Sequence, residues 1–236
     1  MFTELKTEVC RVNKALVDSG LVILTWGNVS GVDRKAGVMA IKPSGVPYDK
    51  LTPDDIVVLK IADGTVLEGK YRPSSDTATH LHLYRAFPNI GGVVHTHSVH
   101  ATAFAQAQRA ISCQGTTHAD HFYGSVPVTR HLTPEEINGE YELNTGKVIA
   151  ETFATLGINA DDVPAALVAG HAPFVWGNSG KKALENAVAL EAIAQMQLAM
   201  LQLHPGIGPL PQVLQDKHFK RKHGPGAYYG QENRKS

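Results

Sequence analysis

The stretch Gly91-Gly92-Val93-Val94-His95-Thr96-His97 connects the fold of this chain with its chemistry. Its glycines and valines predict a short buried strand, and the histidines at its end are spaced i, i+2, so both imidazoles leave the same face of the pleat. Two imidazoles fixed in this way need only one or two more ligands to hold a metal ion. Histidines at this spacing also occur as partly buried, hydrogen-bonded residues, so the pair alone leaves both interpretations open.

A third histidine follows a strand in the same way. Residues 165–169 are apolar and predict a second buried strand that leads to His171. Two strand ends can converge at one edge of a sheet, and three histidines leave an open coordination position, as in catalytic zinc sites. Asp76 lies at a predicted loop-to-helix boundary and is the candidate oxygen ligand. An ordinary helix N-cap is the alternative explanation for it.

Helical and strand patterns alternate along the rest of the chain. We expect helices at residues 5–16, 77–87, 98–108, 145–156 and 183–203, and a basic helical end at 216–223. We expect strands at residues 21–25, 37–41, 56–61, 66–68 and 173–176, with a loop at 26–30. There is no internal repeat and no domain boundary in these patterns. They predict a single α/β domain over residues 1–236, with a mixed or mostly antiparallel sheet and a disordered tail at 231–236.

The composition is that of an ordinary globular protein. The 236 residues carry 22 basic and 22 acidic side chains, so bulk electrostatics favours neither nucleic acid nor a membrane surface. The first residues lack the layout of a signal peptide, and charged residues interrupt the apolar segment at 183–203, so we expect a cytoplasmic protein without a membrane span. Cys10 and Cys113 have no metal-binding spacing and are expected to be free thiols.

Several short loops are suited to an anionic group. Each follows a predicted strand or begins a predicted helix, where free N–H groups favour phosphate, although turns are routinely rich in these residue types. The loop candidates are Gly27, Asn28, Ser44, Gly45, Ser74 and Ser75. Lys42 would add a compact positive charge, so together these residues predict a phosphate cradle without a Walker motif.

Two further residues are candidates for proton transfer. Asp120 is flanked by His118 and His121 in a polar segment, and Tyr229 lies near the C-terminus. A positioned carboxylate or phenol can act as a general acid or base. A solvated aspartate and a packed tyrosine are the alternatives. The sequence contains no nucleophile elbow, and Gly206-Ile207-Gly208 is only a fragment of a dinucleotide fingerprint.

With these residues assembled, the chain resembles the L-ribulose-5-phosphate 4-epimerases of the class II aldolase and epimerase superfamily. The resemblance runs from Leu5 to Gln231 and rests on several motifs in the same order. They are Thr25-Trp26-Gly27-Asn28-Val29-Ser30, Ile41-Lys42-Pro43-Ser44-Gly45, Pro73-Ser74-Ser75-Asp76-Thr77, Gly91-Gly92-Val93-Val94-His95-Thr96-His97-Ser98, Gly115-Thr116-Thr117-His118-Ala119-Asp120, Ile137-Asn138-Gly139-Glu140-Tyr141-Glu142 and Asp216-Lys217-His218. The resemblance implies a three-layer α/β/α sandwich, assembled as a homotetramer with zinc between subunits.

The resemblance also implies roles for individual residues. The metal ligands would be Asp76, His95, His97 and His171. The substrate and its phosphate would be bound by Gly27, Asn28, Lys42, Ser44, Gly45, Ser74, Ser75 and Thr116. Asp120 and, from an adjacent subunit, Tyr229 would be the acid/base pair, with His218 and Glu142 close by. The chain departs from close relatives at His121, Ala169 and Ala172, which affects contacts around the site and not the ligands. The resemblance assigns no role to His100, His121 or His131.

The implied reaction is the interconversion of L-ribulose 5-phosphate and D-xylulose 5-phosphate, which serves arabinose, ascorbate or another pentose catabolism. The C4 proton of this ketose is not adjacent to the carbonyl, so inversion needs oxidation or carbon-carbon cleavage. Without a nicotinamide fingerprint, we expect cleavage and rejoining of C3–C4, assisted by zinc or by manganese or cobalt as a Lewis acid. The alternatives are an aldolase such as L-fuculose-1-phosphate aldolase and a non-catalytic scaffold like the adducin head domain.

Overall fold

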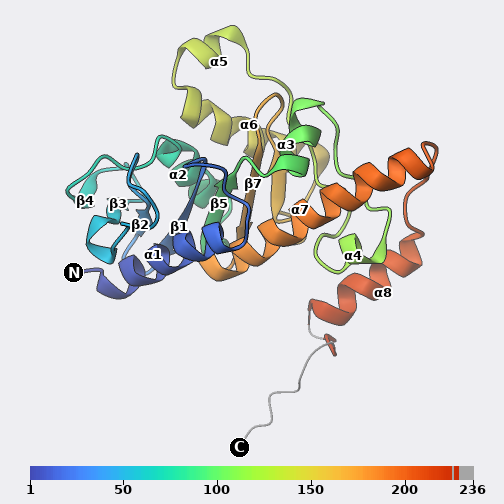
Figure 1. Ribbon diagram of the computed structural model, residues 1–236, viewed down its shortest axis with the longest axis horizontal. Coiled ribbons are helices and arrows are strands. Elements are labelled where there is room, and N and C mark those ends of the chain that lie inside the picture. The colour runs from blue at the N-terminus through green and yellow to red at the C-terminus, as the bar shows by residue number, and fades with distance from the viewer. Residues whose placement is uncertain (225, 229–236) are drawn as a thin grey trace, which may run out of the picture.

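The computed structural model describes residues 1–224 and 226–228, and its centre is one seven-stranded sheet (Figure 1). The strand order is β4-β3-β2-β1-β5-β7-β6, and every pairing between these strands is antiparallel. The strands are β1 (Gly27–Asp33), β2 (Val38–Ile41), β3 (Val57–Lys60), β4 (Val66–Glu68), β5 (Gly92–Thr96), β6 (Ala165–Leu167) and β7 (Pro173–Gly177). The histidine-bearing strand β5 therefore lies inside the sheet, between β1 and β7.

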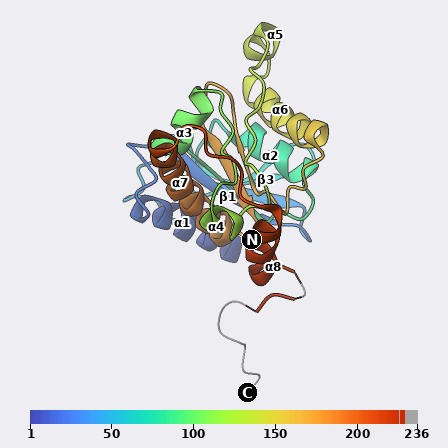
Figure 2. The same ribbon diagram turned by 90° about the vertical axis from the view of Figure 1, so that its right-hand side faces the viewer.

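Helices cover both faces of the sheet, which gives the three layers that the resemblance implies (Figure 2). One face carries α1 (Thr3–Asp18), α3 (Val99–Gln106) and α7 (Gly180–Leu203). The other face carries α2 (Thr77–Ala86) and α6 (Tyr141–Leu156), which pack on each other. The remaining helices are α4 (Thr116–Ala119), α5 (Pro134–Asn138), α8 (Gln212–Lys222) and the 3-10 turn η1 (Pro53–Asp55). Within the described part of the chain, no helix has the length and apolar character needed to cross a membrane.

The two glycines of the opening stretch let the longest helix approach the centre of the sheet. A Cβ atom on Gly92 would lie 2.4 Å from the backbone nitrogen of Gly180, the first residue of α7. A Cβ atom on Gly91 would lie 2.1 Å from the carbonyl oxygen of Asn178. Only glycine fits at both positions, because the obstructing atoms belong to the backbone and cannot rotate away.

The prediction for residues 21–30 is wrong. The expected strand at 21–25 is a tight turn, in which the Trp26 N–H donates to the Ile23 carbonyl at 3.0 Å and Leu24 adopts a positive φ of 57°. The expected loop at 26–30 is instead the start of β1. Its glycine, amide and hydroxyl residues are typical of a turn, but they occupy a strand that is paired on both sides. The polar side chains of Asn28 and Ser30 are buried and form hydrogen bonds with residues far away in the sequence.

Smaller differences concern the boundaries. Helix α6 begins at Tyr141, four residues before the predicted start, and ends at Gly157 in the left-handed region, as the glycine there predicts. Helix α5 was not predicted, although Thr133 and Glu136 form a capping box at its start. His171 lies in the turn between β6 and β7, beyond the strand itself. The hairpin of β3 and β4 is confirmed.

Candidate active site

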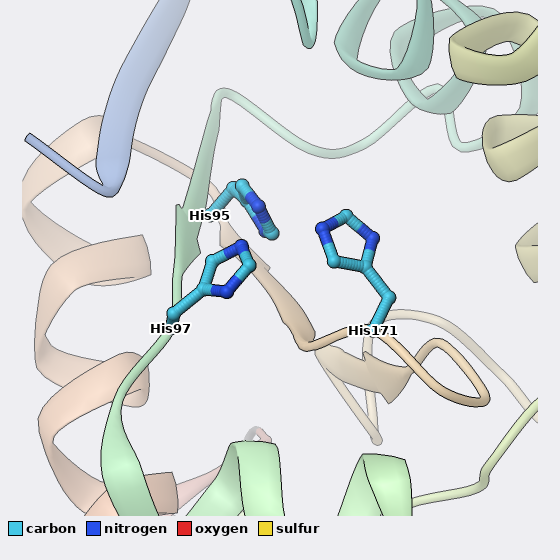
Figure 3. Close-up of side chains that lie close together, drawn as sticks. All are labelled: His95, His97 and His171. Carbon is cyan, nitrogen blue, oxygen red and sulfur yellow. The ribbon is translucent and has the colours of Figure 1, made fainter.

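The three predicted histidines lie together at one edge of the sheet (Figure 3). His95 is the penultimate residue of β5, His97 follows the end of that strand, and His171 lies in the β6–β7 turn. Strand β7 pairs with β5 so that Phe174 is opposite His95, which brings the turn beside the two strand histidines. Each residue offers one ligand nitrogen within 4.8 Å of the other two. The antiparallel pairing therefore converts two separate sequence signals into one cluster.

The surroundings of His97 and His171 favour neutral imidazoles, the form that binds metal ions. Burial, together with the neighbouring histidines His95 and His97, lowers the pKa of His171 to about 4. The Nδ1 atom of His95 lies 3.0 Å from the Pro173 carbonyl, so Nδ1 carries the proton and donates. The Nε2 atom is then left with its lone pair, and the Phe174 ring, stacked at 4.1 Å, fixes the plane of the imidazole. This donor set fits a divalent metal ion.

Asp76 occupies the N-cap position of α2, but its side chain makes no capping hydrogen bond. The Asn28 amide instead donates to the carboxylate at 2.6 Å, and the Ser74 hydroxyl lies 3.5 Å from the same oxygen. Burial raises the pKa of Asp76, but the nearby imidazoles and the Asn28 amide lower it by more. The result is an ionised carboxylate close to the histidines. It lies outside the group of ligand atoms within 4.8 Å of one another.

The histidines and the predicted anion loops line one cavity of about 390 Å³. Its lining includes every loop candidate predicted for phosphate, as well as Asp76 and Glu142. Lys42 is only 3% exposed, and burial lowers the pKa of its ammonium group. Thus one cavity is lined by a carboxylate, three imidazoles, a lysine and polar loops.

Three predicted site residues lie outside the lining of this cavity. Thr116 and Asp120 belong to α4 and its C-terminal cap, and His218 belongs to α8. The His218 Nδ1 atom is 3.0 Å from Asp120 Oδ1, and Arg221 Nη2 is 2.7 Å from Asp120 Oδ2. Burial raises the pKa of Asp120, but Arg221, His218 and Lys222 lower it by more, so the carboxylate is ionised. None of the three lines the cavity that holds the histidines. Tyr229 lies outside the described residues.

The cavity also has walls that the sequence did not single out. The Trp26 ring lies 6.0 Å from His97, and the Tyr141 ring lies 6.5 Å from His171. Both tyrosine and tryptophan stand beside residues that were predicted, Glu142 and Gly27, so proximity in the sequence was the available signal. Pro43 and Thr25 also line the cavity.

Comparison with known proteins identifies the family. Residues 7–198 match the family described as the class II aldolase and adducin N-terminal domain. The chain belongs to the class II aldolase family. Its relatives include the L-ribulose-5-phosphate 4-epimerase UlaF of Salmonella paratyphi A and that of Salmonella typhi. Each is 54% identical over 228 residues, covering 97% of this chain and 99% of the relative.

Solved structures of class II aldolase relatives have the same fold. An L-fuculose 1-phosphate aldolase superposes with a TM-score of 0.77 at 25% identity, covering 92% of this chain and 95% of that one. YgbL of Escherichia coli, described as a putative aldolase, epimerase or decarboxylase, gives a TM-score of 0.71 at 27% identity, covering 91% and 97%. The three-layer architecture of this family member is therefore that of sugar-phosphate aldolases.

Proposed function

We propose that this protein interconverts L-ribulose 5-phosphate and D-xylulose 5-phosphate by inversion at C4. The observation that carries the proposal is the 54% identity to L-ribulose-5-phosphate 4-epimerases, which spans 97% of this chain and 99% of the relative. The cavity supports it, because a cluster of metal-type ligands and a set of loops suited to an anion line the same cavity. A phosphorylated ketose offers oxygen atoms to the first and a phosphate group to the second.

His95, His97 and His171 would hold the metal ion, with Asp76 as a fourth ligand, and zinc is the ion we propose. When bound, such an ion supplies Lewis-acid polarisation of the sugar carbonyl. The protein's own contribution is to keep these ligands ready: the Pro173 carbonyl sets the tautomer of His95, and the Asn28 amide orients the carboxylate of Asp76. A ligand set oriented in advance loses less free energy on binding.

The phosphate group would lie against Lys42 and the loops that carry Asn28, Ser44 and Ser74. Backbone N–H groups and hydroxyls of these loops can donate to phosphate oxygens, and the ammonium group supplies charge. Two backbone hydrogen bonds connect the loops at 42–45 and 72–74. The Ser74 N–H donates to the Lys42 carbonyl at 3.0 Å, and the Ser44 N–H donates to the Arg72 carbonyl at 3.0 Å. This cradle would retain the two-carbon aldehyde phosphate while the C3–C4 bond is broken.

The bond change follows from the position of the stereocentre. A base removes the proton of the C4 hydroxyl, the C3–C4 bond breaks, and the C2 carbonyl accepts the electron pair. The aldehyde rotates, C3 attacks its other face, and an acid returns a proton to the C4 oxygen of the new epimer. We propose Asp120 and Tyr229 as this pair, on opposite sides of the aldehyde, with His218, Thr116 and Glu142 nearby.

Assembly would bring the pair to the substrate. Within one chain, Asp120 is bonded to α8 and lies off the cavity, so a partner subunit would have to supply it, as in a homotetramer. The exposed apolar side chains on α7 support such an assembly, with Met196 48% and Leu203 86% exposed. We also propose a cytoplasmic location for this metabolic activity.

The test is a product assay with L-ribulose 5-phosphate. The proposal expects D-xylulose 5-phosphate as the product, and accumulation of free glycolaldehyde phosphate would instead identify an aldolase. Removal of metal by a chelator should abolish turnover, and added zinc should restore it. Full activity of verified metal-free protein would exclude the metal-assisted mechanism. A wild type that binds no metal and stays inactive with added zinc would favour a scaffold.

Mixing two inactive variants tests the shared site. Asp120→Asn and His97→Ala should each inactivate the protein, but reassembled mixtures should recover about a quarter of the wild-type activity, since about a quarter of shared sites then have both residues. No recovery in mixtures shown to have exchanged subunits would mean that both residues act within one chain.

A further inference from the structure

A buried tyrosine lies behind the proposed phosphate cradle without lining the cavity. Tyr48 is 8% exposed and follows the loop that carries Ser44 and Gly45. Its hydroxyl donates a hydrogen bond to the Gly27 carbonyl. Its ring lies under the Lys42 ammonium group, with Nζ 4.6 Å from the ring centroid. One side chain therefore contacts two separate parts of the cradle, 21 and 6 positions away in the sequence.

The Lys42 ammonium contacts the Tyr48 ring and one backbone carbonyl. Its Nζ atom donates to the Pro43 carbonyl at 3.2 Å, and no carboxylate among the described residues forms an ion pair with it. A desolvated cation over an aromatic face is attracted by the negative face of the ring. The ring keeps the ammonium in place and leaves its charge available for an anion, which an acidic partner would not do.

The hydroxyl of Tyr48 acts on the other half of the cradle. Gly27 is the first residue of β1, and the next residue, Asn28, donates to Asp76. Burial raises the pKa of Tyr48 to about 12, with a smaller contribution from the negative charge of Asp76. The phenol therefore stays protonated and keeps donating. The hydroxyl thus anchors the strand that carries Asn28, while the ring positions Lys42.

We propose that Tyr48 is a positioning residue for the substrate's phosphate group, setting the distance between Lys42 and the Gly27-Asn28 segment. This inference rests on the proposed function, because it assigns Tyr48 to the phosphate subsite of that cavity. Tyr48 touches no reacting atom in this arrangement. Its loss should weaken phosphate binding without changing the chemical step, so KM should rise while kcat is held.

Two substitutions separate the ring from the hydroxyl. Tyr48→Leu removes both contacts, and we expect the KM for L-ribulose 5-phosphate and the inhibition constant of inorganic phosphate to rise about tenfold. Tyr48→Phe retains the ring, so we expect a rise of only about threefold. Both variants should bind wild-type amounts of metal. The matched control is Tyr71→Leu, which removes a tyrosine at 5.1 Å from Lys70 on the protein surface and should change neither constant.

The outcomes distinguish the possibilities. If Tyr48→Leu keeps the wild-type KM and phosphate inhibition, or loses kcat alone, the inference is wrong. If Tyr48→Leu does not fold, Tyr48→Phe still decides, and an unchanged phosphate constant in that variant overturns the inference. If the wild type does not turn over L-ribulose 5-phosphate, the proposed function fails. Calorimetric titration with inorganic phosphate then still tests Tyr48 by itself.

Discussion

The contact between Gly92 and the start of α7 offers a demanding test of how this fold supports its site. In Gly92→Ala the new methyl group would lie 2.4 Å from Gly180 N, 2.5 Å from Gly180 Cα and 2.6 Å from Ser179 C. Ordinary van der Waals contacts of a Cβ atom begin at about 3.4 Å, so the helix and the strand must separate by roughly 1 Å to reach one. No rotamer change can relieve the overlap, because all three atoms belong to the backbone.

The cost should reach the upper end of the range for overpacked cores, about 3 kcal/mol. For a chain of this length that corresponds to a fall in Tm of roughly 10 °C. Gly208→Ala is the matched control, because a Cβ there meets nothing within 4 Å and its φ is unstrained. Its free energy of unfolding should stay within about 0.5 kcal/mol of the wild type.

The measurement is urea unfolding of the two variants and the wild type, at equal protein concentration and without metal. A second readout is zinc affinity, since His95 lies three residues beyond Gly92 on the same strand. We expect Gly92→Ala to lose stability and to bind zinc more weakly. A loss below about 1 kcal/mol would show that α7 moves away from β5 easily, and would refute the reasoning that close backbone contact fixes the site.

Three further predictions concern separate parts of the protein. His171→Asn should reduce bound zinc per subunit, whereas the exposed His131→Asn should retain it; metal analysis decides, and full zinc content in the first variant contradicts the proposed ligand set. Glu191→Leu removes the carboxylate that accepts the His100 and Ala101 N–H groups at 2.8 and 3.0 Å, so it should cost about 2 kcal/mol in urea unfolding, against nearly nothing for the exposed Glu185→Leu. Asp55, which Lys70 and Thr52 bind, has its pKa lowered to about 2. Because this pKa is below the unfolded value, the stabilisation is present above about pH 4 and is lost as the pH falls toward 2. Asp55→Asn should therefore be about 2 kcal/mol less stable than the wild type at pH 7, with the difference vanishing near pH 2; a constant difference would contradict this origin.

Local sequence rules identified most elements because their signals are short in range. Hydrophobic periodicity located α1, and the Asp-Gly turn located the β3–β4 hairpin. The same rules failed at residues 26–30, where Gly27, Asn28 and Ser30 are typical of a turn. A strand there is stabilised by pairing with β5 and β2, and by buried partners such as His80 for the Ser30 hydroxyl at 2.7 Å. Such partners lie 50 positions away and leave no trace in a local pattern.

The sequence by itself determined which residues have the chemistry for a metal and for phosphate. Imidazole, carboxylate and ammonium groups have these properties wherever they lie, so His95, His97, Asp76 and Lys42 could be named from their types and from the motifs around them. The i, i+2 spacing on one strand also determined that His95 and His97 share a face.

Only the tertiary structure decided how these groups act together. The pairing of β7 with β5 places His171 beside the other histidines, and the Asn28 amide turns Asp76 away from its helix cap and into the cavity. The same structure bonds Asp120 to Arg221 of α8, off the cavity, and puts Tyr48 beneath Lys42. Distances between residues far apart in the chain depend on how the whole sheet and its helices pack, and no short stretch of sequence contains that information.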